Sequence, residues 1–329
     1  MTLREAVDRY VAWQRRHGAK FRSSARTLDA FCRQIGEDRS CATVAEDEVR
    51  RFLAGKGVLT RTRAVKYGTL AGFYRFALSR SHVSRIPMPP REAEPRPPEV
   101  APSFIFTRDE LRSLFKAAGG GRRRCPKLDA ETFQTFLLLL YGAGLRNGEA
   151  RRLTVADVDL DSAVLTVNDS KFYKSRLVPV GADLAGMLRR YAATRALRPL
   201  REGTASAFLA CRDGSPLGAA IVRNAFRATL RAAGISSSKP GCRGACLHSL
   251  RHSFATHRLT LWYCEGADVQ ALLPALSTYL GHGSVAATQV YISMTPELLD
   301  EAGCRFERYS ERQRSPDAGQ QKKRSTHDA

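Results

Sequence analysis

The sequence predicts a mainly α-helical protein of two domains, in which the second domain also contains a small antiparallel sheet. The chain has 329 residues, about twice the length of a typical domain. Apolar residues recur at helical spacing through most of the chain, whereas residues 158–167 alternate as β-strands do. Seven of the fifteen prolines lie within residues 87–102, a composition that favours an extended linker over a packed core.

The first domain, residues 1–87, is predicted to be helical throughout. Thr2 with Glu5, and Thr43 with Glu46, have the spacing of a capping box, in which two side chains satisfy backbone groups at the start of a helix. Two groups of apolar residues then follow the helical period. They are Leu3, Val7, Tyr10 and Val11, and then Leu28, Phe31, Cys32 and Ile35.

The last predicted helix of this domain, residues 60–80, combines an apolar stripe with a cationic surface. The stripe consists of Tyr67, Leu70, Tyr74 and Ala77. Residues 51–90 contain eight Lys and Arg residues and no Asp or Glu, whereas a solvated helix usually mixes both signs. We therefore expect the basic residues outside the stripe to contact a phosphate backbone, and these are Arg61, Arg63, Lys66 and Arg75.

A proline-rich linker is predicted at residues 88–104, and a second domain at residues 105–303. Thr107 with Glu110 has the capping-box spacing, and the apolar stretch after Thr132 predicts a buried helix. From Ala219 onward the pattern is again helical. Residues 304–329 are polar and basic, so we expect a mobile tail.

The small sheet is expected near the start of the second domain. Residues 158–167 alternate like a single strand. Residues 176–180 are predicted to pair with it as an edge strand, because Pro179 could not donate a hydrogen bond from a central one.

Charge and composition indicate a polyanionic partner. The net charge is +21, and 43% of the residues are apolar, as in ordinary folded proteins. The longest apolar run, residues 136–145, is about half a membrane span, so we expect no transmembrane helix and favour a nucleic acid over an anionic membrane. Charged residues occupy the N-terminus where a signal peptide needs an apolar run, which predicts a cytoplasmic protein. The eight cysteines lack paired spacing and are expected to be mostly free thiols.

Several common motif classes fail on spacing. The glycines near residue 144 follow a helix and lack the spacing of a dinucleotide loop, and residues 157–168 lack the Gly and Glu that complete a calcium loop. His248 and His252 have the spacing of a zinc protease helix, but Ser249 occupies the position of the glutamate base. Cys242, with Cys246 and His248, has no second ligand pair at matching spacing. We therefore expect no cofactor and no metal.

Four ordered motifs between residues 105 and 300 carry a family resemblance. They are Gly144-Leu-Arg-Asn-Gly-Glu149, Ser170-Lys-Phe-Tyr-Lys-Ser-Arg-Leu-Val-Pro179, His248-Ser-Leu-Arg-His-Ser-Phe-Ala-Thr256, and Leu280-Gly-His282 followed by Tyr291. Together they resemble the tyrosine recombinase (phage integrase) family, and in particular a mobile-element-borne site-specific recombinase. The resemblance implies a SAM-like core-binding domain at the N-terminus and an α+β catalytic domain after the linker.

The resemblance also assigns roles to individual residues. The catalytic set would be Arg146, Lys171, His248, Arg251, His282 and Tyr291, with Glu149 as a supporting carboxylate. Attack on a phosphodiester gathers charge on two nonbridging oxygens, and Arg146 and Arg251 offer guanidinium forks that match them. Tyr291 would be the nucleophile, His248 its base and Lys171 the general acid. His282 would donate a hydrogen bond to a phosphate oxygen.

The family implies cleavage through a 3′-phosphotyrosyl bond with a free 5′-hydroxyl, without ATP or metal. It further implies double-stranded DNA attachment sites as substrates, two domains that close around the duplex, and four protomers that exchange residues from about 296 onward. A type IB topoisomerase and a noncatalytic DNA-binding clamp are the alternative readings.

Taken singly, several of these residues also fit structural roles. Arg146 with Glu149 could be a surface pair, His282 a helix cap, and Tyr291 a core aromatic. Lys171 lacks the flanking glycines that are usual in the family, and Lys174 is close by. The segment 257–279 is longer than its family counterpart.

Overall fold

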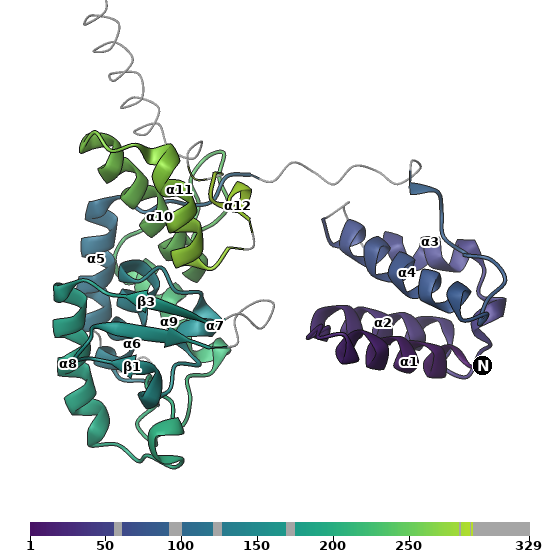
Figure 1. Ribbon diagram of the computed structural model, residues 1–329, viewed down its shortest axis with the longest axis horizontal. Helices are drawn as coiled ribbons and strands as arrows, with labels where there is room; N and C mark the ends of the chain where they lie inside the picture. Colours follow the sequence, from purple (N-terminus) through teal and green to yellow (C-terminus); the bar gives the residue numbers. More distant parts are fainter. Residues whose placement is uncertain are drawn as a thin grey trace, which may run out of the picture. The chain divides into compact units, whose positions relative to one another are not determined.

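A computed structural model describes residues 1–55, 61–91, 101–120, 127–168, 175–282, 284–289 and 291. It divides into two compact units, residues 1–100 and 101–329. The division falls inside the predicted linker of residues 88–104, whose central part lies outside the described residues. The predicted domain boundaries therefore remain a proposal. The mainly helical fold with a small antiparallel sheet is confirmed (Figure 1).

Helices make up the N-terminal unit in its described part (Figure 1). They are α1 (Leu3–Arg16), α2 (Arg22–Ile35), α3 (Glu46–Ala54) and α4 (Arg61–Ser79). The capping box at α1 is confirmed, because Thr2 Oγ1 accepts from the Glu5 amide at 3.2 Å and Glu5 Oε2 accepts from the Thr2 amide at 3.0 Å. The apolar stripe of α4 is also confirmed, since Leu70, Tyr74 and Ala77 are fully buried.

The predicted capping box at Thr43 is wrong. The helix α3 begins later, with Ala45 at its N-cap, and Glu48 Oε2 accepts from the Ala45 amide at 2.9 Å. Thr43 instead ends a 3-10 turn, where its hydroxyl donates to the Ser40 carbonyl at 3.0 Å. Thr43 Oγ1 accepts from Arg39 Nε at 3.3 Å, and the residue lies two positions before the N-cap of α3, so it does not cap that helix.

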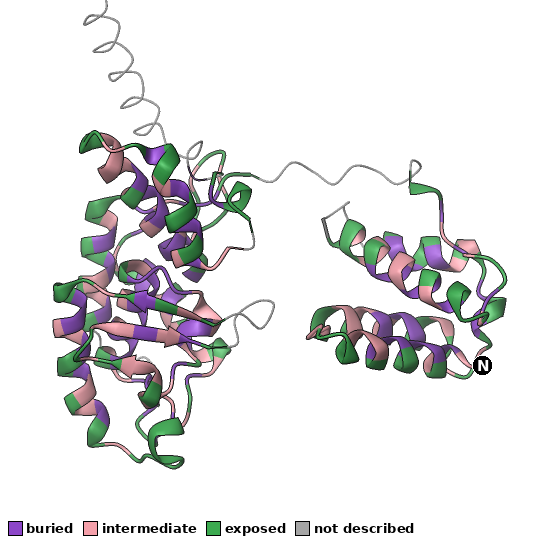
Figure 2. Ribbon diagram, viewed as in Figure 1, coloured by how far each residue is buried: buried purple, intermediate pink, exposed green. Residues whose placement is uncertain are grey.

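Several helices of the C-terminal unit pack against α6 (Ala130–Gly142). The other helices are α5 (Arg108–Gly119), α7 (Asn147–Ala150), α8 (Ala182–Ala196), α9 (Ala219–Ala232), α10 (Leu247–Cys264), α11 (Val269–Leu280) and α12 (Ala286–Gln289). The predicted capping box at Thr107 and Glu110 opens α5, and α6 is buried as expected. In both units the buried residues gather on the sides of the helices that face their neighbours (Figure 2).

The sheet has the strand order β1-β2-β3 and is antiparallel, with β1 (Val158–Asp159), β2 (Val164–Val167) and β3 (Arg176–Pro179). The edge position of β3 is confirmed. The prediction of one strand over 158–167 is wrong, because a turn divides it. Asp159 Oδ1 accepts from the amides of Asp161 (3.0 Å) and Ser162 (2.9 Å), a side-chain-bonded turn that reverses the chain.

The long segment 257–279 continues α10, turns, and forms most of α11 (Figure 1). Its apolar residues build a core cluster of their own, which also contains Tyr291. The segment thus packs against Tyr291, the predicted nucleophile.

Two expectations concern the cysteines and membranes. Six of the eight cysteines are described, and none of these six forms a disulfide bond: Cys32, Cys41, Cys211, Cys242, Cys246 and Cys264. No helix in the described part of the chain has the length and apolar content that crossing a membrane requires. The predicted tail, residues 304–329, lies outside the described residues.

Candidate active site

Gly144 shapes the first motif. Its φ of +60° is a conformation that favours glycine, and a Cβ at this position would lie 2.7 Å from Phe254 Cδ1 and 2.9 Å from Leu280 Cδ2. The chain can therefore pass close to α10 and α11 only without a side chain here. Arg146 follows two residues later as the N-cap of α7, with its side chain 27% exposed.

Glu149 is the buried acceptor of this site. Its Oε1 accepts from Arg146 Nη1 at 2.7 Å, and its Oε2 accepts from the Arg146 amide at 2.9 Å. Its side chain is only 2% exposed. Burial alone would raise the pKa of this carboxyl, but hydrogen bonds from Arg176 and Arg146 lower it to about 2. Arg146 and Glu149 are thus part of a buried network and not a surface pair.

Arg176 completes the network and was missed as a site residue in the sequence. Its Nη1 and Nη2 donate to Glu149 Oε1 (3.1 Å) and Oε2 (2.9 Å), and its Nε donates to the Tyr279 carbonyl at 2.9 Å. One signal could have identified it. In a strand the side chains alternate, so Arg176 shares a face with buried Val178, whereas Leu177 between them is 66% exposed.

Arg251 lies deeper than Arg146. It is 1% exposed, and its Nη1 and Nη2 donate to the carbonyls of Gly144 (2.7 Å) and Leu280 (2.5 Å). Burial, followed by the charge of Arg146, lowers its pKa to about 10. Its Nε finds no hydrogen-bond partner among the described residues. A buried donor of this kind is costly to leave unsatisfied, so it suits an incoming acceptor oxygen.

The end of α11 contains the Leu280-Gly-His282 motif. Gly281 ends the helix in the left-handed conformation (φ +67°), and its carbonyl accepts from Arg146 Nη2 at 2.7 Å. A Cβ on Gly281 would lie 2.8 Å from Arg176 Nη1. Gly281 is therefore the C-cap residue, and the His282 amide also completes the helix end by donating to the Ser277 carbonyl at 2.9 Å.

His282 and Tyr291 lie against each other. The His282 ring stacks on Tyr291 with centroids 6.0 Å apart, and its Nδ1 lies 2.7 Å from Thr288 Oγ1. Tyr291 is 3% exposed and packs in the apolar cluster of α10 and α11. Burial raises the pKa of its phenol, and the charge of Arg251 partly offsets this. Tyr291 is thus a core aromatic whose hydroxyl side faces an arginine.

His252 is a second residue that the sequence analysis missed, since it was considered only as a zinc ligand. Its ring lies 5.4 Å from that of Tyr291 and 4.4 Å from that of His248, one helical turn before it. Its Nδ1 is buried and has no partner among the described residues. The spacing of four residues from His248 is the signal that could have placed it on the same face of α10.

All three imidazoles of the site favour the neutral form. Desolvation, and then the charges of Arg251 and Arg146, lower the pKa of His248 and of His282 to about 4. Desolvation and the neighbouring His248 lower the pKa of His252 to about 3. His248 is the exposed member of the three, whereas His252 and His282 are half-buried. Neutral imidazoles can accept a proton, which a base near Tyr291 must do.

Other predicted residues are only partly placed. Lys171 lies outside the described residues, and Arg61 starts α4 with a side chain that is also outside them. Lys66 Nζ donates to the Phe52 carbonyl at 3.1 Å and lies 4.5 Å from the centre of the Phe52 ring. The ammonium group of Lys66 is therefore bound within the N-terminal unit. Arg75 is exposed and Arg63 half-buried. Their contacts with DNA stay a prediction.

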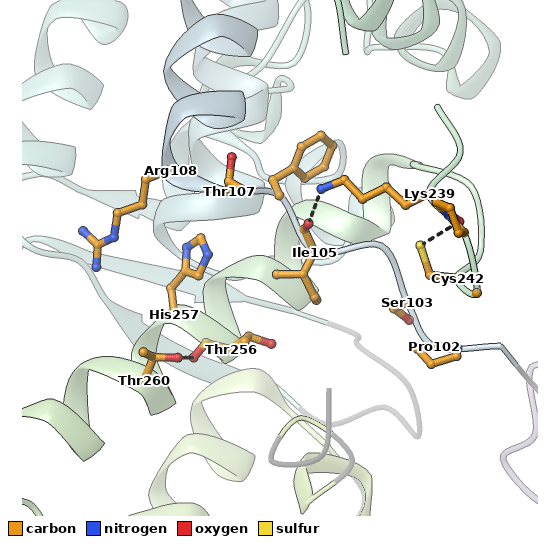
Figure 3. Close-up of a pocket in the computed structure, with 13 residues that line it drawn as sticks. Pro102, Ser103, Ile105, Thr107, Arg108, Lys239, Cys242, Thr256, His257 and Thr260 are labelled. Carbon is orange, nitrogen blue, oxygen red and sulfur yellow. Dashed lines mark hydrogen bonds between the residues drawn. The ribbon is translucent and has the colours of Figure 1, made fainter. Parts of the chain in front are cut away.

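Two other features do not belong to this site. Among the residues that the structure describes, no three His, Cys, Asp or Glu side chains gather as metal ligands. A pocket of about 600 Å³ lies between residues 102–108, residues 239–242 and the α10 residues Thr256, His257 and Thr260 (Figure 3). None of the predicted catalytic residues lines it.

Comparisons with known proteins agree with the motifs. Residues 105–297 match the model of the phage integrase family. The putative integrase/recombinase y4rB of Sinorhizobium fredii is 35% identical over 312 residues, which cover 93% of this chain and 98% of that protein. Tyrosine recombinase XerC of Chlorobaculum parvum is 33% identical over 290 residues, which cover 82% of this chain and 81% of that protein.

Solved structures show the same fold at low identity. The Tn1549 transposon integrase in complex with transposon right end DNA matches 94% of this chain and 100% of its own, with a TM-score of 0.69 and 16% identity. A lambda integrase dimer bound to a COC′ core site matches 90% of this chain and 97% of its own, with a TM-score of 0.64 and 19% identity.

The fold and these matches define a tyrosine site-specific recombinase. The chain belongs to the phage integrase family. Nothing in the comparisons favours a type IB topoisomerase or a noncatalytic clamp.

Proposed function

We propose that this recombinase cleaves DNA by attack of Tyr291, leaves a 3′-phosphotyrosyl bond and a free 5′-hydroxyl, and then joins the broken strand to a partner strand. One observation carries the proposal. Arg146, Arg251 and Tyr291 come from three separate parts of the chain and converge at the end of α11. Two guanidinium groups beside one phenol match the charge that gathers on a phosphodiester under attack.

The chemistry follows from the protonation states. Tyr291 gives its proton to a neutral imidazole, with His248 as the proposed base, and the phenolate oxygen forms a bond to phosphorus. The bond from phosphorus to the 5′-oxygen breaks, and Lys171 is proposed to protonate the leaving oxygen. Arg146, Arg251 and His282 would donate hydrogen bonds to the nonbridging oxygens.

Access to this site requires movement. Arg251 is 1% exposed and Tyr291 is 3% exposed, so a phosphate reaches them only after the residues that cover them shift. DNA binding would supply the free energy for this shift through contacts elsewhere on the chain.

The proposed partners are double-stranded DNA attachment sites. The Tn1549 and lambda integrases cited above are both seen bound to DNA, which supports this. We also propose four protomers in the active assembly, exchange of the chain after residue 296 between them, and a cytoplasmic setting. The domain limits of 1–87, 88–104, 105–303 and 304–329 are part of the same proposal.

Covalent trapping tests this function. Nicked duplexes from the DNA that flanks the gene are incubated with the full chain, and protein–DNA adducts are resolved by denaturing electrophoresis. Tyr291→Phe should abolish the adduct and spare DNA binding, because only the nucleophilic oxygen is removed. Tyr263→Phe, a nearby tyrosine on α10, serves as the matched control and should still form the adduct.

Each other outcome contradicts a definite part of the proposal. Binding without any adduct from the wild-type chain indicates a noncatalytic clamp. Adducts without sequence preference, together with relaxation of supercoiled DNA, indicate a topoisomerase. An adduct that survives in Tyr291→Phe places the nucleophile elsewhere.

A further inference from the structure

We infer that Arg176 is a positioning residue, which holds Glu149 and the end of α11 in the geometry that presents Arg146 and His282 to a DNA phosphate. This inference rests on the proposed function. It concerns a residue of the sheet, outside the predicted catalytic set.

The first step is the bonding around Glu149. Each carboxylate oxygen accepts one hydrogen bond from Arg176 and one from Arg146, at distances of 2.7 to 3.1 Å. Both arginines therefore bond to both carboxylate oxygens. Arg176 fixes the orientation of the carboxylate plane, and the carboxylate in turn holds Arg146. A planar fork can do this, whereas a lysine can reach only one point.

The second step is the link to α11. Arg176 Nε donates to the Tyr279 carbonyl, and its guanidinium fills the space that a Cβ on Gly281 would need. Arg146 Nη2 donates to the Gly281 carbonyl in the same turn. Both arginines thus hold the helix end that immediately precedes His282.

The third step concerns charge. The side chain of Arg176 is only 10% exposed, and all three of its nitrogens are engaged by protein acceptors. Glu149 is surrounded by Arg146 at the N-cap of α7, Arg176 on β3 and Arg251 on α10, with Arg251 Nη1 at 3.9 Å from Glu149 Oε2. Without Arg176, the burial of Glu149 is less compensated, and the carboxyl takes up a proton at higher pH.

The experiment compares cleavage rates per folded molecule in the trapping assay, with the folded fraction measured by thermal unfolding. Arg176→Met and Arg176→Lys should each slow cleavage by about 10- to 100-fold, the range typical when the partner that orients a functional side chain is lost. Arg195→Lys is the matched control. Arg195 is 2% exposed and donates to the Ala207 carbonyl at 2.9 Å, away from the site, so its loss should change cleavage less than about twofold.

A pH profile separates positioning from a general loss of stability. Wild-type Glu149 has a pKa of about 2 and stays ionised between pH 5 and 7. Arg176→Met should lose cleavage rate as the pH falls through this window, because Glu149 becomes protonated and releases Arg146. The double variant Arg176→Met/Glu149→Gln has no such carboxyl. Its cleavage rate should therefore not fall between pH 7 and 5. The reduction of its rate relative to wild type should be smaller than the product of the reductions in the two single variants.

Several results would overturn the inference. Cleavage by Arg176→Met at the wild-type rate, fully multiplicative effects in the double variant, or an acid limb that persists without Glu149 would each do so. Should Arg176→Met fail to fold, the cleavage rates of Arg176→Lys and of Arg176→Lys/Glu149→Gln decide the matter, because lysine keeps the charge and removes only the fork geometry. A wild-type chain that forms no adduct would contradict the proposed function itself, which is a distinguishable result.

Discussion

Arg146 and Arg251 donate to the carbonyl oxygens of two consecutive residues, Gly281 at 2.7 Å and Leu280 at 2.5 Å. The end of one helix therefore spaces the two guanidinium groups that are proposed to hold the scissile phosphate. Any change that alters this turn should alter both arginines together.

Gly281→Ala should destabilise the C-terminal unit and slow cleavage. The left-handed φ of +67° disfavours a side chain by about 1–3 kcal/mol. The added Cβ would also meet Arg176 Nη1 at 2.8 Å, and this guanidinium is held by three hydrogen bonds and cannot easily move. Urea unfolding and the trapping assay measure the two effects.

Gly186→Ala is the matched control for that substitution. Gly186 lies in α8, and nothing lies within 4 Å of the Cβ that alanine would add. Alanine should stabilise this helix by about 0.5–1 kcal/mol, because glycine loses more backbone entropy on folding. Equal stability of the two variants would show that the turn at Gly281 is not strained by a side chain.

The second prediction is that the DNA-free protein loses stability in mild acid through His252 and His282. Their pKa values are lowered to about 3 and about 4, against an ordinary value near 6.5. Burial is the main cause for both rings, and the positive charge of Arg251 lowers both pKa values further. Between these limits the unfolded chain binds protons that the folded chain does not. The free energy of unfolding should therefore have its full value above about pH 6.5 and should decrease as the pH falls towards 4.

Urea unfolding at pH 7, 6 and 5 measures this dependence. His252→Gln removes one of the titrating groups, so its stability should decrease less steeply with falling pH than that of the wild-type protein. Parallel curves for the two proteins would show that His252 is protonated equally in the folded and unfolded chains.

The third prediction separates two basic residues of α4. Arg75 is exposed, and Arg75→Gln should weaken DNA binding equally for all sequences and lower the slope of log K against log salt by about one. Lys66 is held by the Phe52 carbonyl and ring, so Lys66→Gln should change that slope less and instead destabilise the N-terminal unit. Electrophoretic mobility shifts at several salt concentrations measure the slopes, and identical slopes for both variants would contradict the prediction.

Local sequence patterns predicted the helices because the forces that form them act within a few residues. The capping boxes at Thr2 and Thr107 and the stripe of α4 are of this kind. The two local errors, at Thr43 and within residues 158–167, arose where a side chain bonded to a neighbouring turn. At both places the residue types are compatible with two hydrogen-bonding patterns, and the sequence does not show which of the two forms.

By itself, the sequence determined the helical architecture, the edge position of the strand that contains Pro179, and the residue types of the candidate site. Only the tertiary structure decided that Arg176 bonds to Glu149 and that His252 lies against Tyr291. Periodicity reports which face of an element is buried, but not which distant element covers it. The bonds from Arg146 to Gly281 and from Arg251 to Gly144 span 135 and 107 residues, and they exist because α10 and α11 pack beside the turn before α7.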